Sequence, residues 1–343
     1  MQEMTASTAN DATRVLSTHG LHGLIWSFWF GADGLAHPLT GEEALDALDR
    51  RDGWVWLHFD LIDGRARTTL QTMIDLPEDA REIMLGHDDH QRIDTFGEVI
   101  AGVITDFERA EELDPRRMLA WRFCMLPHAF ISARRSPLHT MARVHDQARM
   151  GRHFAGVLHL FDAVVDNYAA TLAAVVQEIS AQLNDVEDSL LDEREQGDHE
   201  KLGLARRSTV RLHRATVPLR AILRHLLRDR PSWFTSAAAE DCEQAAEQVE
   251  SVIADLGALK ERGHALQDEL ASRQAELTNR KLTLLSVFSA FILPPTLISG
   301  IFGMNVDGLP FREASPNGFT LTLALMAGSV AVLLLVLRRL KLV

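Results

Sequence analysis

Hydrophobic positions follow three successive patterns along the 343-residue chain. Short apolar runs broken by turn residues fill positions 21–150, a three- and four-residue spacing runs through 151–281, and long uncharged runs occupy 282–302 and 319–337. Short runs are typical of buried strands, the second pattern indicates helices, and an uncharged run of about 20 residues can cross a bilayer. The chain therefore predicts an α+β membrane protein with a mixed α/β domain, a helical stalk and two C-terminal transmembrane helices.

The first domain follows a polar segment, 1–20, that we expect to be disordered. Thr40, with Glu43 three residues later, has the sequence of a helix-capping box. Several consecutive strands favour a mixed sheet over a wholly parallel one. We expect strands at 24–30, 54–59, 92–96, 99–106, 119–126 and 129–133, and helices at 40–49, 65–74, 77–85 and 137–149.

The stalk is predicted to contain three helices. The first begins at Val157 and extends for about ten turns with one apolar face. The second covers 199–228 and is rich in arginine. The third begins near Ala237, has spacing that resembles a coiled-coil seam, and meets no helix-breaking signal before the membrane. A single helix over 237–302 would be on the order of 100 Å long.

Charges at the ends of the two apolar runs predict their orientation. Positive residues prefer the cytoplasmic side of a membrane. The connecting segment, 303–318, contains Arg312 as its one cation, so we expect it on the outer, periplasmic side. Both chain termini, including the basic tail 338–343, should be cytoplasmic. The flanking cations are Arg280, Lys281, Arg338, Arg339 and Lys341.

Composition narrows the possible functions. A formal net charge of -13 argues against nucleic acid as a partner, and two isolated cysteines give no Cys-x-x-Cys zinc site. The polar N-terminus lacks the apolar core of a signal peptide. The sequence shows no glycine-rich phosphate loop and no nucleophile elbow, so we expect neither an enzyme nor an ATP-driven pump.

Three short motifs carry a family resemblance. The first uncharged run ends in Ser-Gly-Ile-Phe-Gly-Met-Asn at 299–305, Trp-Leu-His occurs at 56–58, and Glu-Asp-Ser-Leu-Leu-Asp occurs at 187–192. With two C-terminal spans, these motifs resemble the CorA family of divalent-cation channels, and the chain as a whole is most similar to its zinc-transporting ZntB branch. Two positions depart from that branch: Met304 stands where its Gly-x-Asn commonly has Val or Ile, and Asp307-Gly308 replaces its Gly-Gly.

The resemblance implies a funnel-shaped homopentamer in the bacterial inner membrane. Its pore would be lined by the first span, 282–302, with Asn305 as the ion-selecting entrance, supported by Gly303 and Met304. Asparagine also ends helices, which is the alternative role for Asn305. The resemblance further suggests Asp268 as a regulatory metal ligand, although an exposed helix charge is the ordinary role of such a residue.

A face of the first span supports the pore on physical grounds. Steps of three to five residues back from Asn305 give a small and hydroxylated end followed by leucines, as expected for an ion site above a dry constriction. Small residues and hydroxyls also mark helix contacts in membranes, which is the competing interpretation. The face consists of Gly300, Thr296, Leu293, Ser289, Leu285, Leu282 and Thr278.

The transported ion is less sharply defined. The resemblance favours Zn²⁺, but no histidine follows His264 and no cysteine follows Cys242, so the pore offers oxygen ligands that suit hydrated Mg²⁺ equally. Co²⁺ and Ni²⁺ belong to the same alternative. Asp307 and Glu313 could attract cations at the mouth. We expect no covalent cofactor. A non-conducting coiled-coil scaffold or metal sensor is the alternative from another class.

Overall fold

The computed structural model describes residues 21–72, 74–110, 113–115, 117–191, 198–304 and 318–339. The segment 1–20 and most of the loop between the two apolar runs lie outside these residues. By contacts the chain divides into one unit over 1–266 and a second over 267–343. The long helix α7 (Ser236–Gly303) contributes to both units.

The first unit contains a seven-stranded mixed sheet in the order β2-β1-β3-β7-β6-β5-β4. All neighbours pair antiparallel except β3 and β7, which are parallel. The expectation of a mixed sheet is therefore confirmed. The strands are β1 (Leu24–Phe30), β2 (Ala36–Pro38), β3 (Trp54–Asp60), β4 (Arg92–Phe96), β5 (Val99–Phe107), β6 (Met118–Leu126) and β7 (Ala129–Arg134).

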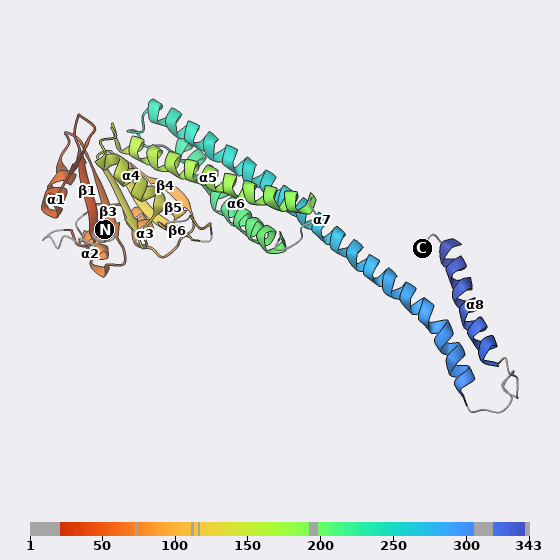
Figure 1. The fold of residues 1–343 in the computed structure, drawn as a ribbon. Coiled ribbons are helices and arrows are strands. Elements are labelled where there is room, and N and C mark those ends of the chain that lie inside the picture. Colours follow the sequence, from red (N-terminus) through yellow and green to blue (C-terminus); the bar gives the residue numbers. More distant parts are fainter. Residues whose placement is uncertain are drawn as a thin grey trace, which may run out of the picture. The chain divides into compact units, whose positions relative to one another are not determined.

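Helices cover both faces of this sheet (Figure 1). One face packs against α1 (Gly41–Asp49), α2 (Gly64–Thr72) and α3 (Glu78–Leu85) through a single apolar core. The other packs against α4 (His139–Arg149) and α5 (Val157–Leu191). Burial on two faces explains why β3 begins with four consecutive apolar residues, Trp54 to Leu57, instead of alternating, because both sets of its side chains leave water.

Two helix starts show how the sequence sets the element boundaries. The expected capping box is present, since the Thr40 side chain accepts a hydrogen bond from the Glu43 backbone N–H and Glu43 accepts one from the Thr40 N–H. The α4 start is capped from another element. Asp106, at the end of β5, accepts hydrogen bonds from the Thr140 backbone N–H at 2.9 Å and from the Thr140 hydroxyl at 2.7 Å.

A buried polar group lies on the α4 and α5 face of the sheet. The Ser132 hydroxyl donates to the Leu57 carbonyl oxygen and accepts from the Trp56 indole N–H at 3.0 Å. The ring of His58 lies with Nδ1 2.7 Å from the same hydroxyl and stacks on Trp26, with ring centroids 3.9 Å apart. These contacts join β1, β3 and β7 in the centre of the sheet.

The stalk helices begin on the sheet and extend away from it. α5 contacts the sheet through Phe161, which packs against Phe123 of β6, and then pairs with α6 (Asp198–Arg228). The loop after α6 is fixed to the β4–β5 turn, where the Trp233 indole N–H donates to the Glu98 carbonyl oxygen at 2.8 Å. Stalk helices and sheet are thus joined into one unit.

The second unit contains the end of α7 and α8 (Gly318–Arg339). The expectation of one unbroken helix from the stalk into the first apolar run is confirmed, because α7 continues for 68 residues and through Pro294 and Pro295. Both helices are long and apolar enough to span a membrane.

Candidate ion-conducting segment

The apolar part of α7 exposes large side chains over its full circumference. None of its most hydrophobic 18-residue window is buried within the chain, and Leu293, Phe288 and Leu285 are 66%, 65% and 63% exposed. Exposed apolar patches of this size indicate contact with lipid or with other protein. The segment therefore requires a hydrocarbon environment or protein neighbours beyond the described residues of one chain.

The seven residues predicted to line a pore all lie on this helix and are all exposed. Their successive spacings of four, three, four, four, three and four residues place them within an arc of roughly 80° at about 100° per residue. Thr296 and Gly300 lie nearest the C-terminal end, and the leucines lie mainly below them. The helix therefore presents one narrow stripe that is distinct from the bulky residues around it.

Hydroxyl groups in this stripe are oriented by the backbone of their own helix. The Thr296 hydroxyl donates to the Ile292 carbonyl oxygen at 2.7 Å, and the Thr278 hydroxyl donates to the Gln274 carbonyl oxygen at 2.8 Å. Each hydroxyl has one proton, so its oxygen retains only acceptor capacity toward the outside. The water molecules around a cation point their hydrogens away from the ion, so acceptor oxygens can bind this water shell.

Two glycines of the segment are not required by close packing against other described residues. A Cβ atom built at Gly300 or Gly303 meets none of their atoms within 4 Å. Small residues in membrane helices allow backbones to approach closely. The space beside these two glycines is therefore available to a neighbouring helix or to solvent.

The structure describes two of the remaining predicted site residues, Met304 and Asp268. Met304 is exposed directly after α7, whereas Asn305, Asp307 and Glu313 lie outside the described residues. Asp268 is exposed on α7. Within the described part of the chain, no group of three or more His, Cys, Asp or Glu side chains has an arrangement that could hold a metal ion.

The segment His87-Asp88-Asp89-His90 has metal-ligand residue types, but its carboxylates contact cationic groups. Asp88 pairs with His90 at 2.6 Å and with Arg92 at 2.5 Å. These contacts, with the His90 side chain the largest cause, hold the pKa of Asp88 well below its usual range. Asp89 pairs at 2.7 Å with Arg122, whose side chain is fully buried. The arrangement anchors a loop, and its acceptors are already engaged.

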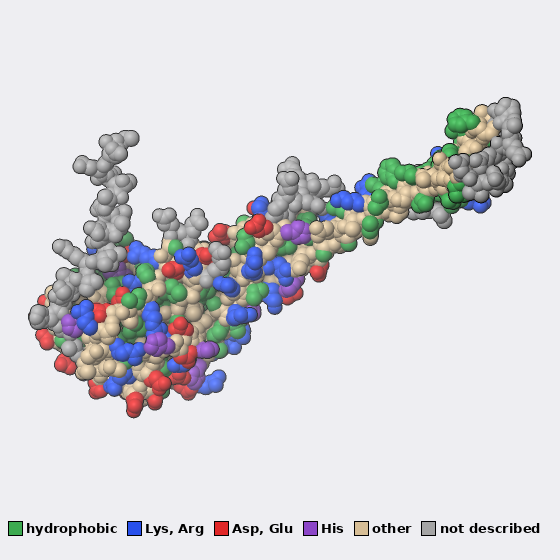
Figure 2. Space-filling view, turned by 90° about the horizontal axis from the view of Figure 1, so that it is seen from below, with side chains coloured by type: hydrophobic (Ala, Val, Ile, Leu, Met, Phe, Trp, Pro, Cys, Tyr) green, Lys and Arg blue, Asp and Glu red, His purple; other side chains and the backbone are tan. Residues whose placement is uncertain are grey.

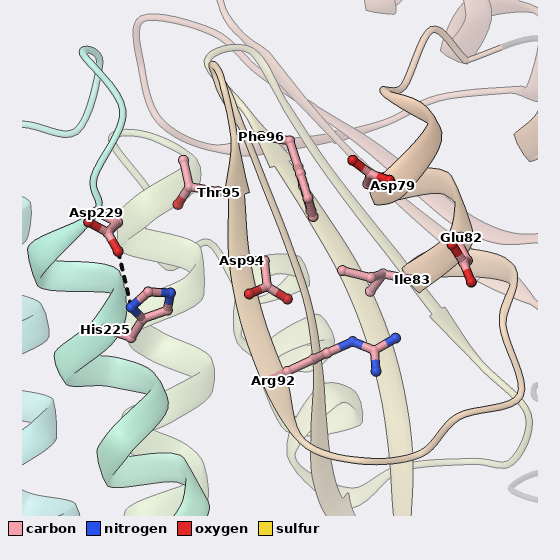
Figure 3. Close-up of a pocket in the computed structure, with 9 residues that line it drawn as sticks. All are labelled: Asp79, Glu82, Ile83, Arg92, Asp94, Thr95, Phe96, His225 and Asp229. Carbon is pink, nitrogen blue, oxygen red and sulfur yellow. Dashed lines mark ion pairs between the residues drawn. The ribbon is translucent and has the colours of Figure 1, made fainter.

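A pocket of about 490 Å³ lies between α3, β4 and the C-terminal end of α6 (Figure 3). Carboxylates predominate around it, and the His225 ring pairs with Asp229 at 3.1 Å on the α6 side. The sequence does not reveal this pocket, because its three elements are far apart in the chain. The lining residues are Asp79, Glu82, Ile83, Arg92, Asp94, Thr95, Phe96, His225 and Asp229.

Three further acids approach one another where α5 meets the start of α7. Partial burial, followed by the charges of Asp166 and Asp241, raises the pKa of Asp162 to about 6. Burial also raises the pKa of Asp166. The spacing of Asp162 and Asp166 by four residues was visible in the sequence, but their proximity to α7 was not.

Comparison with known proteins identifies the family. A family model described as CorA-like Mg2+ transporter protein matches residues 51–339. The chain belongs to this family. It is accordingly a divalent cation transporter with transmembrane helices and not an enzyme, and the resemblance found in the sequence is confirmed. The family consists of bacterial inner-membrane transporters, and the two apolar helices fit that location.

Two curated CorA-family relatives match most of the chain. The divalent cation transporter CmaX of Pseudomonas aeruginosa is 27% identical over 326 residues, which cover 93% of this chain and 96% of that protein. The zinc transport protein ZntB of Yersinia pseudotuberculosis is 22% identical over 278 residues, 81% of this chain and 84% of its own.

Solved structures show the same fold. The structure of full-length CmaX superposes with a TM-score of 0.80 at 25% identity, covering 94% of this chain and 99% of that one. The CorA magnesium transporter of Methanocaldococcus jannaschii gives 0.75 at 17% identity, covering 91% and 97%. The likeness therefore extends over the soluble unit and the apolar helices together.

Proposed function

We propose that this CorA-family transporter conducts hydrated divalent cations, zinc first, through a homopentameric pore lined by the stripe of α7 from Thr278 to Gly300. The observation that carries the proposal is the stripe itself, which is narrow and exposed, with Gly300 and Thr296 at its C-terminal end and three leucines closer to its N-terminal end. One hairpin cannot enclose a path for water, so several copies are required. The number five and the preference for zinc rest on family resemblance.

The two ends of the stripe would have different tasks. At the outer end, Asn305 carboxamides arranged in a ring would accept hydrogen bonds from an ion's water shell, with Gly303 and Met304 supporting the turn. A helix C-terminus also favours a cation. Toward the cytoplasm, rings of Leu293 and Leu285 would form a constriction that closes by excluding water.

Orientation follows from the charges that flank the spans. Arg280 and Lys281 precede the first span, and Arg338 and Arg339 lie in the last turn of α8. We propose that both flanks are cytoplasmic, which places the soluble unit inside the cell and Asn305 at the outer mouth. Asp307 and Glu313 would then raise the cation concentration outside.

Zinc and magnesium would pass through the same oxygen-lined path by retaining their water. Zinc prefers nitrogen and sulfur ligands when it is bound directly. The stripe from Thr278 to Gly300 offers hydroxyl oxygens and no such ligand, so selectivity would depend on the water shell. The ZntB relatives support zinc, while the family description names Mg²⁺. The alternative is a channel of the same family that carries magnesium, cobalt or nickel.

Flux into liposomes tests the proposal directly. Purified protein is reconstituted with an enclosed dye sensitive to Zn²⁺ or to Mg²⁺, and each metal is added outside. We expect uptake of zinc that exceeds uptake of magnesium and that Asn305→Ala abolishes. Folding of the variant is verified by tryptophan fluorescence, since all six tryptophans lie in the first unit.

The outcomes separate the competing functions. Magnesium uptake greater than zinc uptake would transfer the assignment to the magnesium alternative. Absence of flux for every divalent ion, from a folded and oligomeric preparation, would favour the non-conducting scaffold. If flux persists unchanged in Asn305→Ala, then Asn305 does not form the ion-selecting entrance.

A further inference from the structure

The stalk contains one helix of opposite charge to the rest of the protein. α6 has eight Lys or Arg residues and two acids, whereas the chain as a whole has a net charge of -13. Three of its exposed arginines, Arg207, Arg214 and Arg228, recur at seven and fourteen residues and so share one side of the helix. Figure 2 shows Lys and Arg side chains, in blue, at intervals along the helical part of the chain.

The neighbouring helix α7 presents an acidic face. From 236 to 266 it has seven acids and two basic residues. Glu243 and Glu261 are exposed and eighteen residues apart, which is five complete helical turns, so they point in one direction. The exposed residues between them on this side include Ala254 and Ala258, which leave room for another helix to approach.

Contacts within one chain fix the relative heights of the two helices. Arg206 of α6 contacts His264 of α7 at 3.1 Å, and Arg220 contacts Glu250 at 3.3 Å. Moving fourteen residues along α6 therefore moves fourteen residues back along α7. On this scale Arg207 is level with position 263 and Arg228 with position 242. Position 263 is two residues from the exposed Glu261, and position 242 is one residue from the exposed Glu243. Two residues correspond to roughly 3 Å along the helix axis.

We propose that the basic face of α6 in one copy binds the acidic face of α7 in the next copy, with Arg207 opposite Glu261 and Arg228 opposite Glu243. The inference rests on the proposed closed ring of copies. In a ring whose axis runs along these helices, rotation introduces no rise, so groups level with each other in one copy are also level between copies. The charges then match at both ends of a surface about five turns long.

We assign a second copy of this chain as the partner because one chain carries both the basic face of α6 and the acidic face of α7, with their charges at matching heights. Within one copy, α6 already contacts α7 through other residues, since Arg220 and Arg224 both pair with Glu250. The faces that contain Arg207 and Glu261 remain exposed. A heterologous contact, in which the basic face of one copy meets the acidic face of the next, pairs opposite charges at every interface and can close into a ring.

Paired cysteines test both the surface and its register. In a full-length protein with Cys124→Ala and Cys242→Ala, we introduce Arg207→Cys with Glu261→Cys, or Arg228→Cys with Glu243→Cys. Crossed pairs, Arg207→Cys with Glu243→Cys and Arg228→Cys with Glu261→Cys, are about 30 Å out of register and serve as controls. A disulfide requires Cα atoms within about 7 Å.

Mild oxidation in membranes should link the in-register pairs into a ladder of oligomers on a non-reducing gel and leave the crossed pairs as monomers. Native mass measurement of the unmodified protein shows independently whether a ring forms. An oligomeric protein without a ladder would overturn this interface and leave the proposed pore intact. A monomeric protein would overturn both.

Charge reversal provides a second readout. Glu243→Arg with Glu261→Arg should reduce the oligomeric fraction at low salt by at least severalfold, because like charges then face each other between copies. Adding Arg207→Glu and Arg228→Glu should restore it. If the fourfold variant assembles no better than the double variant, the helices do not meet as proposed.

Discussion

The Ser132 hydroxyl oxygen lies 2.7 Å from Nδ1 of His58 in the middle of the sheet. With the hydroxyl proton directed to the Leu57 carbonyl oxygen, Nδ1 of His58 donates to Ser132, and burial lowers the pKa of the ring so that it stays neutral. Nε2 is buried without a hydrogen-bond partner among the described residues. A proton added there would gain no acceptor and would lose water.

Burial of His58 therefore predicts a loss of stability in acid. Complete burial, followed by the charges of Arg134 and His145, lowers the pKa of His58 well below 6.5. Below that pH the unfolded chain binds a proton that the folded chain does not. This group should remove on the order of 1 kcal/mol from the free energy of unfolding as the pH falls from 7.5 to 5.5.

Denaturant titration of the full-length protein in detergent, followed by tryptophan fluorescence, measures this change. His58→Gln should lower stability at pH 7.5 but weaken its dependence on pH over the same interval. An equal pH dependence in the variant and the unmodified protein would show that other groups cause it.

Asp106 should stabilise the start of α4 through hydrogen bonds to Thr140. Asp106→Ala would leave the buried Thr140 N–H without an acceptor and should cost about 2 kcal/mol in free energy of unfolding. Asp106→Asn retains one oxygen acceptor and should cost less. Denaturant titration of both variants tests this order, and equal losses would contradict it.

Asp106 has a pH dependence opposite in sign to that of His58. Burial raises the pKa of Asp106 from 3.8 to about 6 despite its hydrogen bonds. The stabilising contribution of this group is thus present below pH 4 and is lost as the pH rises through 6. Comparison of Asp106→Asn with the unmodified protein across this interval should show the difference.

The outward acceptor at Thr296 should assist ion passage. Thr296→Val keeps the side-chain shape and removes the oxygen, and it should reduce zinc flux by about tenfold, equivalent to a barrier about 1.4 kcal/mol higher. Thr283→Val is the matched control, because Thr283 also donates to a backbone carbonyl but lies away from the stripe. Equal effects of both variants on dye-reported uptake would argue against the stripe.

The leucines of the stripe should hold the resting path dry. Leu285→Ser would add a polar group to the constriction and should increase uptake under conditions that keep the unmodified protein closed. Leu284→Ser makes the same chemical change at a neighbouring position that is 54% exposed and faces another direction. If the Leu284 variant leaks more than the Leu285 variant, the constriction does not lie on the stripe that contains Leu285.

The long elements could be predicted from sequence because each has a sustained local signal. Uncharged length identified the spans, and helical spacing identified α7 from 237 onward. By contrast, β2 was missed. It is a three-residue edge strand ending in Pro38, and its pairing with Phe28 depends on a partner strand and not on its own composition.

The candidate site was predictable only where its residues share one helix. Steps of three and four residues were enough to place Thr296, Leu285 and Thr278 on one stripe. The pocket beside His225 combines α3, β4 and α6, and the Asp162 cluster joins two helices. Such groupings depend on tertiary packing, which spacing along the chain does not encode.

The parallel pairing of β3 with β7 has a consequence for synthesis on the ribosome. Val55 pairs with Ala129, so β1 and β3 cannot join the rest of the sheet until residue 134 has left the exit tunnel. The spans begin about 150 residues later. The sheet can therefore be completed before hydrophobic segments emerge, and nascent chains halted after residue 266 should already resist protease.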